Sequence, residues 1–357
     1  MKKQIAVLPG DGVGPEVTAQ AVKVLKKIAQ EYHHEFTFTE GLIGAVAIEK
    51  AGDPLPDETL ELCKNADAIL FGAIGHPKYD NNPSLKVRPE QGLLKLRKEL
   101  GLYANIRPIM TFPNVKSSPL KDEVIKNVDF VVVRELTGGI YFGDKGRKEN
   151  SAFDVCTYTK EEIERVAKLA FKLAQERSRL RKASASQGKL TLIDKANVLE
   201  TSRLWRETIQ EQSKQFSNVT IEYMFVDNAA LQIIKRPSSF DVILTDNMFG
   251  DILTDEASVI AGSIGLLPSA SKGEKTSLFE PIHGSFPKAS GTNTANPIGS
   301  ILSAAMLLDM SLQLAKESKA IRKAVFAVLE KGYGTKDITT NSPLQTHTIG
   351  DKITALI

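Results

Sequence analysis

The sequence has few cysteines and no long apolar run, and each shortage excludes a class of protein. The two cysteines among the 357 residues, Cys63 and Cys156, are far apart and lack CxxC spacing. This favours reduced thiols in a cytoplasmic protein over a disulfide. The apolar residues 5–8 are too few for the core of a signal peptide, and no apolar run is long enough to span a bilayer.

The chain also lacks a strong excess of charge. Its 46 basic and 43 acidic residues leave a net charge of only +3, which gives no indication of a nucleic-acid or membrane partner. No internal repeat and no Walker A pattern is present. The hydrophobic content of 42% is ordinary for a globular protein, and the length suffices for two domains or one large α/β unit.

Short apolar runs alternate with helical patterns along the chain. Thr159 and Glu162 form a capping box at the start of one of these helices. Such alternation is typical of an α/β sheet with helices on its faces. A basic and then Ser- and Gly-rich stretch, 177–188, predicts an exposed loop. The predicted strands are 4–8, 68–71, 130–133, 190–193, 221–226 and 242–244, and the predicted helices are 15–29, 159–181 and 300–314.

Residues 139–157 predict a projecting β-hairpin. Ile140, Tyr141 and Phe142 precede a polar turn that contains glycine, and a second apolar run follows at 155–157. A two-stranded hairpin is marginally stable alone in water. We therefore expect it to pair with a second chain.

The stretch NMFGDILTDE, 247–256, places Asp251 and Asp255 four residues apart. On a helix this spacing puts both carboxylates on one face, where they repel each other unless a cation compensates them. Oxygen ligands favour Mg²⁺ or Mn²⁺. The alternative is a solvated acidic helix end that suits the helix dipole. The apolar run 240–244 favours a site, because open α/β sheets bind ligands at strand ends.

The glycines of GDGVGPE do not form a dinucleotide fingerprint. Gly10, Gly12 and Gly14 are spaced GxGxG rather than GxGxxG, and Pro15 follows at once. Tight turns that lead from the first strand into a helix beginning at Pro15 explain this pattern better.

Four stretches together resemble the β-decarboxylating dehydrogenases, the family that acts on isopropylmalate, isocitrate, homoisocitrate and tartrate. They are LPGDGVGPE (8–16), NMFGDILTDE (247–256), EPIHGSFP (280–287) and TANPIGSILSAAMLL (294–308). The resemblance implies a two-domain α/β fold with a non-Rossmann cofactor site in a cleft between the domains. The cofactor domain would combine 1–102 with 262–357. The domain 103–261 would bind substrate and form a homodimer through the arm 139–157.

The resemblance also implies roles for carboxylates and for an acid–base pair. Asp227, in MFVDNAALQ, matches a third metal carboxylate beside Asp251 and Asp255, and also a substrate ligand. Tyr141 and Lys195 match the catalytic acid and base. Lys195 and Asp227 would lie in the active-site cleft of the partner subunit. Without the resemblance, Tyr141 would be interpreted as a side chain that packs within a strand, and Lys195 as an exposed amine at a strand end.

Three arginines match the substrate clamp of the family, namely Arg97, Arg107 and Arg134, each near a predicted strand or helix end. Guanidinium groups suit bidentate binding of carboxylates. Leu93 and Leu94 match apolar positions around an isopropyl group, where burial contributes about 0.8 kcal/mol per methylene and an ionised carboxylate meets a desolvation cost. Taken alone, each arginine would be interpreted as a surface residue, and Leu93 and Leu94 as part of the core-facing side of a helix. Val198 completes the implied substrate set.

His283 matches an adenine-binding loop that continues to Asn296. Lys288 stands where many NAD-using members have Asp, while NADP enzymes place a cation near the ribose. A single exposed cation contributes little after screening. We therefore expect NAD to be preferred, with weak discrimination against NADP. The implied cofactor residues are Glu90, Glu280, His283, Gly284, Ser285, Lys288, Ala295 and Asn296.

These observations predict a cytoplasmic enzyme that uses NAD and Mg²⁺ or Mn²⁺. The expected reaction is oxidative decarboxylation of 3-isopropylmalate to 4-methyl-2-oxopentanoate in leucine biosynthesis. The alternatives are a sibling reaction on isocitrate, homoisocitrate, tartrate or malate, and a non-catalytic regulatory subunit. Such a subunit should lack part of the metal or acid–base set, which is complete here.

Overall fold

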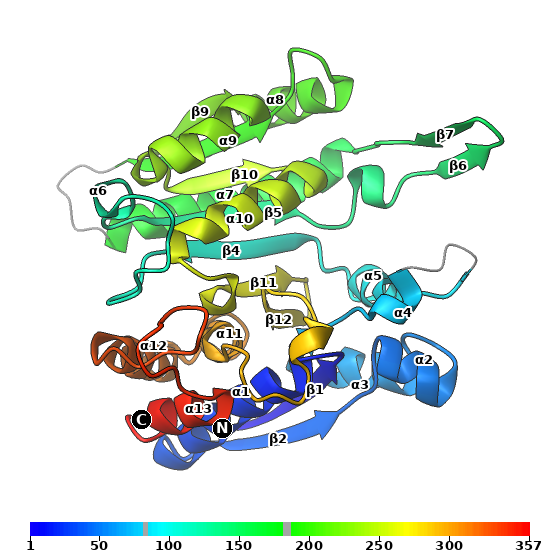
Figure 1. The fold of residues 1–357 in the computed structure, drawn as a ribbon. Coiled ribbons are helices and arrows are strands. Elements are labelled where there is room, and N and C mark those ends of the chain that lie inside the picture. Colours follow the sequence, from blue (N-terminus) through cyan, green and yellow to red (C-terminus); the bar gives the residue numbers. More distant parts are fainter. Residues whose placement is uncertain (81–84, 181–186) are drawn as a thin grey trace. The chain divides into compact units, whose positions relative to one another are not determined.

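The computed structural model describes residues 1–80, 85–180 and 187–357, and Figure 1 shows its helices and strands. The chain forms two compact units. The first comprises Met1–Leu102, Phe112–Ser118 and Ala261–Ile357, and the second comprises Tyr103–Thr111 and Pro119–Ile260. The expected domains, 1–102 with 262–357 and 103–261, differ from these units at 112–118 and at Ala261, and their functional assignment stays a prediction.

The strands of the first unit lie side by side in the order β2 (Glu35–Glu40), β1 (Lys2–Gly10), β3 (Ala68–Ala73), β12 (Ser277–Pro281) and β11 (Pro268–Lys272). All neighbours are parallel except β11, which runs antiparallel to β12. Every residue of β3 is buried. This continuous apolar run suits a parallel strand that is covered on both faces.

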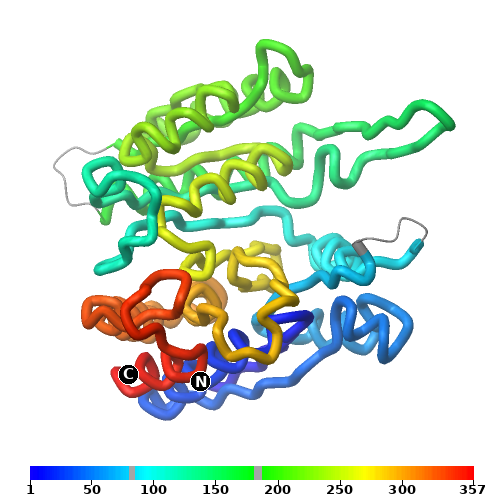
Figure 2. Tube along the Cα trace, in the orientation of Figure 1, coloured from blue at the N-terminus to red at the C-terminus, as the bar shows by residue number. Residues whose placement is uncertain are grey.

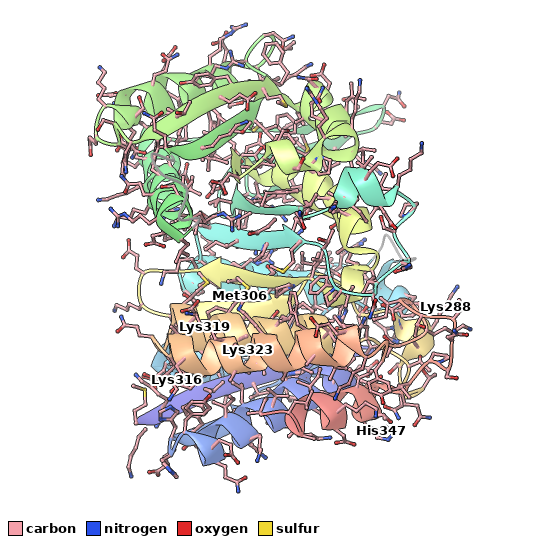
Figure 3. All side chains as sticks on the ribbon, turned by 90° about the vertical axis from the view of Figure 1, so that its left-hand side faces the viewer. Lys288, Met306, Lys316, Lys319, Lys323 and His347 are labelled. Atoms are coloured by element: carbon pink, nitrogen blue, oxygen red, sulfur yellow. The ribbon has the colours of Figure 1, made fainter. Side chains whose placement is uncertain are left out.

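Helices cover this sheet. α1 (Gly14–Glu31) packs on α11 (Ile298–Met310) and α13 (Thr346–Thr354), and α11 packs on α12 (Ala315–Glu330) and β12. The N- and C-terminal segments therefore lie close together (Figure 2). Lys316, Lys319 and Lys323 lie on the exposed face of α12 (Figure 3). The remaining helices of this unit are α2 (Ala45–Ala51), α3 (Asp57–Asn65), α4 (Pro77–Asp80) and α5 (Pro89–Glu99).

The second unit has four parallel strands in the order β5 (Asp129–Glu135), β10 (Val242–Thr245), β8 (Gly188–Asp194) and β9 (Val219–Phe225). β4 (Ala104–Met110) runs antiparallel beside β5. In this register Thr245 is the neighbour of both Arg134 and Ile193. The residues that follow β8 and β10 are thus brought to the same edge of the sheet as Arg134.

The long helix α7 (Lys160–Leu180) supplies much of the core of the second unit. Its buried side chains, among them Val166 and Phe171, pack against Leu190, Leu192 and Trp205. The expected capping box is confirmed, since the Thr159 N–H donates to Glu162 Oε2 at 2.8 Å and the Glu162 N–H to Thr159 Oγ1 at 3.2 Å. The other helices are α6 (Asp122–Ile125), α8 (Glu200–Ser213), α9 (Val226–Lys235) and α10 (Asn247–Ala261).

The predicted hairpin is present but shorter than expected. β6 (Lys145–Lys148) pairs with β7 (Ser151–Asp154), and the hairpin projects from its unit in Figure 1. The expected strand at 140–142 was wrong, because Gly139–Tyr141 forms a 3₁₀ turn. Gly139 has a φ of +74°, which does not continue a strand. Within the described residues, no helix combines the length and apolarity needed to cross a membrane.

Three other boundaries differ from expectation. The strand predicted at 221–226 ends at Phe225, and α9 begins at Val226. The helix predicted at 300–314 ends at Met310, and a new helix follows. Of the loop predicted at 177–188, residues 177–180 continue α7 and 181–186 lie outside the described residues.

The glycine turn after β1 has the structural role that its spacing predicts. Gly10 has a φ of +69°, and a Cβ at this position would lie 1.9 Å from the carbonyl oxygen of Ala73 on the neighbouring strand β3. Only glycine allows this approach without a clash. α1 then begins at Gly14, with Pro15 in its first turn.

Candidate active site

In the second unit, α10 presents the two carboxylates that the sequence singles out. Asp251 and Asp255 lie one turn apart, and the pKa of Asp255 is raised, mainly by burial. Two arginines lie close to them. Arg107 Nη2 is 3.8 Å from Asp251 Oδ1, its Nη1 is 3.6 Å from Asp255 Oδ1, and Arg134 forms a direct ion pair with Asp251. These cations offset the mutual repulsion of the carboxylates.

Arg134 is held at the end of β5 by an asparagine. Its Nε and Nη2 both donate to Asn247 Oδ1, at 3.0 and 2.7 Å, and Arg134 is only 3% exposed. Its guanidinium carbon lies 5.8 Å from the ring centre of Tyr141. This arrangement fixes the direction in which the remaining guanidinium nitrogen points.

Tyr141 is bonded to the same carboxylate, because its hydroxyl donates to Asp251 Oδ2 at 3.0 Å. Burial raises the pKa of Tyr141, and the charge and hydrogen bond of Asp251 raise it further. The phenol is therefore protonated at neutral pH, which is the form that can donate a proton.

Arg107 lies in the middle of β4, so the expectation that it stands near a strand end was wrong. It is 8% exposed, and its Nε donates to Asn105 Oδ1 at 2.7 Å. Its Nη1 donates to Thr254 Oγ1 at 2.5 Å. The antiparallel pairing of β4 with β5 places Asn105 beside Arg134, so both arginines lie on neighbouring strands.

Lys195 and Asp227 meet at the ends of two adjacent parallel strands. Lys195 directly follows β8, Asp227 lies in the first turn of α9 after β9, and Lys195 Nζ donates to Asp227 Oδ1 at 2.6 Å. This hydrogen bond lowers the pKa of Asp227. Val198 follows in the next turn and is 62% exposed.

The three predicted metal carboxylates do not form one cluster within a single copy of the chain. Among the described residues no group of three Asp, Glu, His or Cys side chains could hold a metal ion. The pair Asp251 and Asp255 nevertheless supplies anionic oxygen donors, as Mg²⁺ and Mn²⁺ require. The donor set therefore fits a hard divalent ion once a further oxygen ligand is supplied.

In the first unit, α5 carries the remaining substrate candidates. Arg97 Nη2 donates to Glu280 Oε1 at 3.1 Å, and Arg97 Nε is buried with no hydrogen-bond partner in the described structure. An unpaired buried N–H is costly and suits an anionic ligand. Leu93 is 8% exposed, and Leu94 is more accessible. Glu90 lies one turn earlier, with its Oε1 close to Gly75.

The first unit also contains a cavity of about 410 Å³. The Nε2 of His283 is buried without a partner in the described part of the chain, while Nδ1 lies 2.9 Å from the Gly284 carbonyl oxygen. Burial lowers the pKa of His283, which favours the neutral ring. The cavity is lined by Val13, Ser263, Ile264, Gly265, His283, Gly284, Phe286, Thr294, Ala295, Asn296 and Asp337.

The structure brings four of the predicted cofactor residues to this cavity: His283, Gly284, Ala295 and Asn296. Glu90, Glu280, Ser285 and Lys288 are not among its lining residues. Lys288 is exposed at the edge of the first unit in Figure 3. An apolar cavity with an unpaired ring nitrogen and an amide fits a planar heteroaromatic group such as adenine.

Sequence reasoning missed the residues that hold the site in place. Asp337 accepts hydrogen bonds from Asn296 Nδ2 at 3.0 Å and from Ser263 Oγ at 2.5 Å. In the second unit, Asn105, Asn247 and Thr254 orient the arginines. Asn247 and Thr254 lie inside the acidic motif 247–256, so their closeness to Asp251 in the sequence could have indicated them. No feature of the sequence indicated Asp337.

The chain belongs to the isocitrate/isopropylmalate dehydrogenase family, whose model matches residues 4–353. It is 54% identical over 342 residues to the 3-isopropylmalate dehydrogenase of Geobacillus kaustophilus, covering 94% of this chain and 90% of the relative. It is 51% identical to the 3-isopropylmalate dehydrogenase of Bacillus subtilis, covering 100% of this chain and 98% of the relative.

Two solved structures are also similar. An isocitrate dehydrogenase from Methylococcus capsulatus has a TM-score of 0.87 at 31% identity and covers 99% of both chains. A β-decarboxylating dehydrogenase from Thermococcus kodakarensis in its apo form has a TM-score of 0.79 at 36% identity, over 99% of this chain and 96% of that one. The predicted family and fold class are thereby confirmed.

The acidic residue before α10 generates a prediction about pH. Burial raises the pKa of Asp246 from 3.8 to about 6. Below about pH 4, Asp246 is protonated in both the folded and the unfolded protein. Above about pH 6 the folded protein must hold a buried negative charge, which costs free energy. The contribution of Asp246 to stability is therefore lost as pH rises from about 4 to about 6. Asp246→Asn should therefore stabilise the protein at pH 7.5 by up to about 3 kcal/mol and have little effect at pH 4.

Urea unfolding at the two pH values measures this difference. The asparagine can still accept the hydrogen bond that the Phe249 N–H donates to Asp246 Oδ1. Asp309→Asn, on the exposed side of α11, is the matched control and should behave alike at both pH values. An Asp246→Asn effect independent of pH would contradict the prediction.

Proposed function

We propose that this enzyme oxidatively decarboxylates 3-isopropylmalate to 4-methyl-2-oxopentanoate and CO₂, reducing NAD, in leucine biosynthesis. The observation that carries the proposal is the convergence of Arg107, Arg134 and Tyr141 on the carboxylate pair of α10. Relatives named as 3-isopropylmalate dehydrogenases, at more than 50% identity, support the choice of substrate. A cytoplasmic location remains a prediction.

Asp251 and Asp255, with Asp227 from a second copy of the chain, would hold Mg²⁺ or Mn²⁺. When bound, the ion supplies positive charge that makes the C2 hydroxyl more acidic and stabilises the enolate oxygen after CO₂ is lost. NAD supplies the hydride acceptor for C2. The cavity of the first unit, lined by His283 and Asn296 among others, would hold its adenine end.

The arginines would bind the two carboxylates of the substrate. Arg107 is oriented by Asn105 and Thr254, and Arg134 by Asn247, so little side-chain freedom is lost when an anion binds. Arg97 would contribute its unpaired Nε. Leu93, Leu94 and Val198 would surround the isopropyl group and favour it over a third carboxylate.

Two side chains would move the protons. Lys195 Nζ would accept the proton of the C2 hydroxyl, directly or through water, as hydride leaves C2. Its partner Asp227 keeps the amine in position at 2.6 Å. The Tyr141 hydroxyl would then donate a proton to the carbon that has lost CO₂, since its raised pKa keeps it protonated until that step.

Exposed apolar side chains near these groups support a homodimer with shared sites. Val198 is 62% exposed, Leu231 of α9 57%, and Ile252 of α10 60%. Ile252 directly follows a predicted metal ligand. Apolar surface of this kind is typical of a subunit interface. A second copy that covers it would bring Lys195 and Asp227 to the partner's carboxylate pair.

The sibling reactions on isocitrate, homoisocitrate, tartrate or malate are the main alternative. Leu94 disfavours the tricarboxylates but discriminates less against small malate-like substrates. A regulatory subunit is disfavoured because Tyr141, Lys195 and all three aspartates are present.

A substrate panel tests the proposed function. Isopropylmalate should give the highest kcat/KM among isopropylmalate, isocitrate and malate. Leu94→Asn should weaken transition-state binding of isopropylmalate by ~1–3 kcal/mol, which lowers its kcat/KM by roughly fivefold to 160-fold, and should affect malate less. Equal losses on both substrates would show that Leu94 is only helix core, and a preference of the wild type for isocitrate would reject the assignment.

The metal site is tested by binding as well as by activity. Asp251→Asn removes one anionic ligand, so Mn²⁺ affinity should fall by at least about tenfold and activity should be partly restored at high Mn²⁺. Calorimetric titration of Mn²⁺ into the metal-free protein measures the affinity. Asp309→Asn serves as the exposed control. Full activity of Asp251→Asn in chelator-treated buffer would refute the metal assignment.

The cofactor preference is tested at Lys288. The wild type should prefer NAD, and Lys288→Asp should raise the ratio of kcat/KM for NAD to that for NADP by about tenfold, since it replaces attraction for a 2′-phosphate by repulsion. Lys319→Asp on α12 is the matched charge reversal and should leave the ratio unchanged. A wild-type preference for NADP would overturn the prediction.

A further inference from the structure

Phe286 combines two unfavourable features at one position. Its side chain is 60% exposed, although it is a large apolar ring. Its backbone is left-handed, with φ 38° and ψ 63°. Residues other than glycine and asparagine rarely adopt this backbone conformation. Strain of this kind persists only where the surrounding structure imposes it, and it is commonly found at ligand sites.

The neighbouring backbone imposes this conformation. The Val13 N–H donates to the Ser285 carbonyl oxygen at 2.8 Å, and the Ala289 N–H donates to that of Phe286 at 3.0 Å. Pro287 follows directly and disfavours the right-handed helical region for the residue before it. Phe286 is thus fixed from both sides, and its exposed ring is not the result of a loose loop.

The ring borders the cavity that contains His283 and Asn296. Ile264 and Ala295 supply further apolar lining, while the unpartnered Nε2 of His283 can hydrogen-bond the edge of a ligand. A purine matches both features, because it has apolar faces and an edge of nitrogen donors and acceptors. A ligand stacked on the exposed ring would cover it, which would account for a phenylalanine at this position.

We propose that Phe286 is a cofactor-binding residue whose ring stacks on the adenine of the dinucleotide and covers one side of the cavity. This inference rests on the proposed use of NAD and adds a contact particular to this chain. Base–aromatic stacks contribute substantially to binding and tolerate changes of the base, so the contact should strengthen NAD and NADP alike.

Titration calorimetry with AMP tests the inference without turnover. Phe286→Ala should weaken AMP binding by about tenfold, which lies within the range for loss of one base–aromatic stack. Phe286→Tyr retains an aromatic face and should bind AMP within about twofold of the wild type. Leu180→Ala removes an apolar side chain that is 80% exposed elsewhere and should have no effect. In steady-state assays, Phe286→Ala should raise KM for NAD by about tenfold while kcat changes less than twofold.

The outcomes separate the two proposals. Wild-type protein that binds neither AMP nor NADH would overturn the proposed NAD function together with this inference. AMP binding that is equally tight in the wild type and in Phe286→Ala would overturn the stacking role and leave the proposed function intact. Equal weakening in Phe286→Ala and Phe286→Tyr, with urea unfolding unchanged, would also overturn it.

Discussion

The balance of charge around Asp251 is the constraint on which the rest of the site depends. One carboxylate is shared by the guanidinium of Arg134 and the hydroxyl of Tyr141, and Arg107 lies 3.8 Å away. A second carboxylate, Asp255, stands one turn further along α10. Without the arginines the two aspartates would repel each other on a partly buried helix, and without the aspartates the two buried guanidinium groups would lose two nearby negative charges. Neither set is stable alone, so strands β4 and β5 and helix α10 must be assembled before the site exists.

The elements that carry strong periodicity could be predicted from the sequence, and those defined by sheet register could not. The capping box of α7 and the spacing of Asp251 and Asp255 are local signals, and both correspond to what the structure shows. Arg107 was expected near a strand end but lies within β4, whose segment contains Pro108, a residue that argues against a strand inside a sheet. Asn105 lies opposite Arg134 because β4 and β5 pair antiparallel in this register. No local sequence pattern encodes that pairing.

The cavity of the first unit that is lined by His283 and Asn296 likewise contains residues that the sequence did not indicate. His283 and Asn296 were found through a motif, whereas Asp337 and Phe286 were missed because their importance lies in conformation and distant contacts. Asp337 comes from a loop more than forty positions after Asn296 in the chain, yet it bonds the amide directly. Phe286 looks unremarkable in the letters HGSFP, and only its left-handed backbone and its exposure distinguish it. Strain and long-range hydrogen bonds are properties of the folded state, so a single sequence gives no measure of them.

The arrangement in the second unit also links the two kinds of ligand that the proposed reaction requires. Arg107 and Arg134 now neutralise the same oxygens that a divalent cation would take. A cation bound by Asp251 and Asp255 would compete with the guanidinium groups for those oxygens and turn their positive charge toward an incoming substrate carboxylate. The substrate anion would in turn offset the positive charge of arginines whose ion pairs with α10 have exchanged. Each ligand would therefore remove an electrostatic cost of binding the other, and linkage would make this coupling reciprocal. The hydrogen bonds from Arg134 to Asn247 and from Arg107 to Asn105 do not involve the carboxylates, so they can hold both side chains in place while the ion pairs exchange.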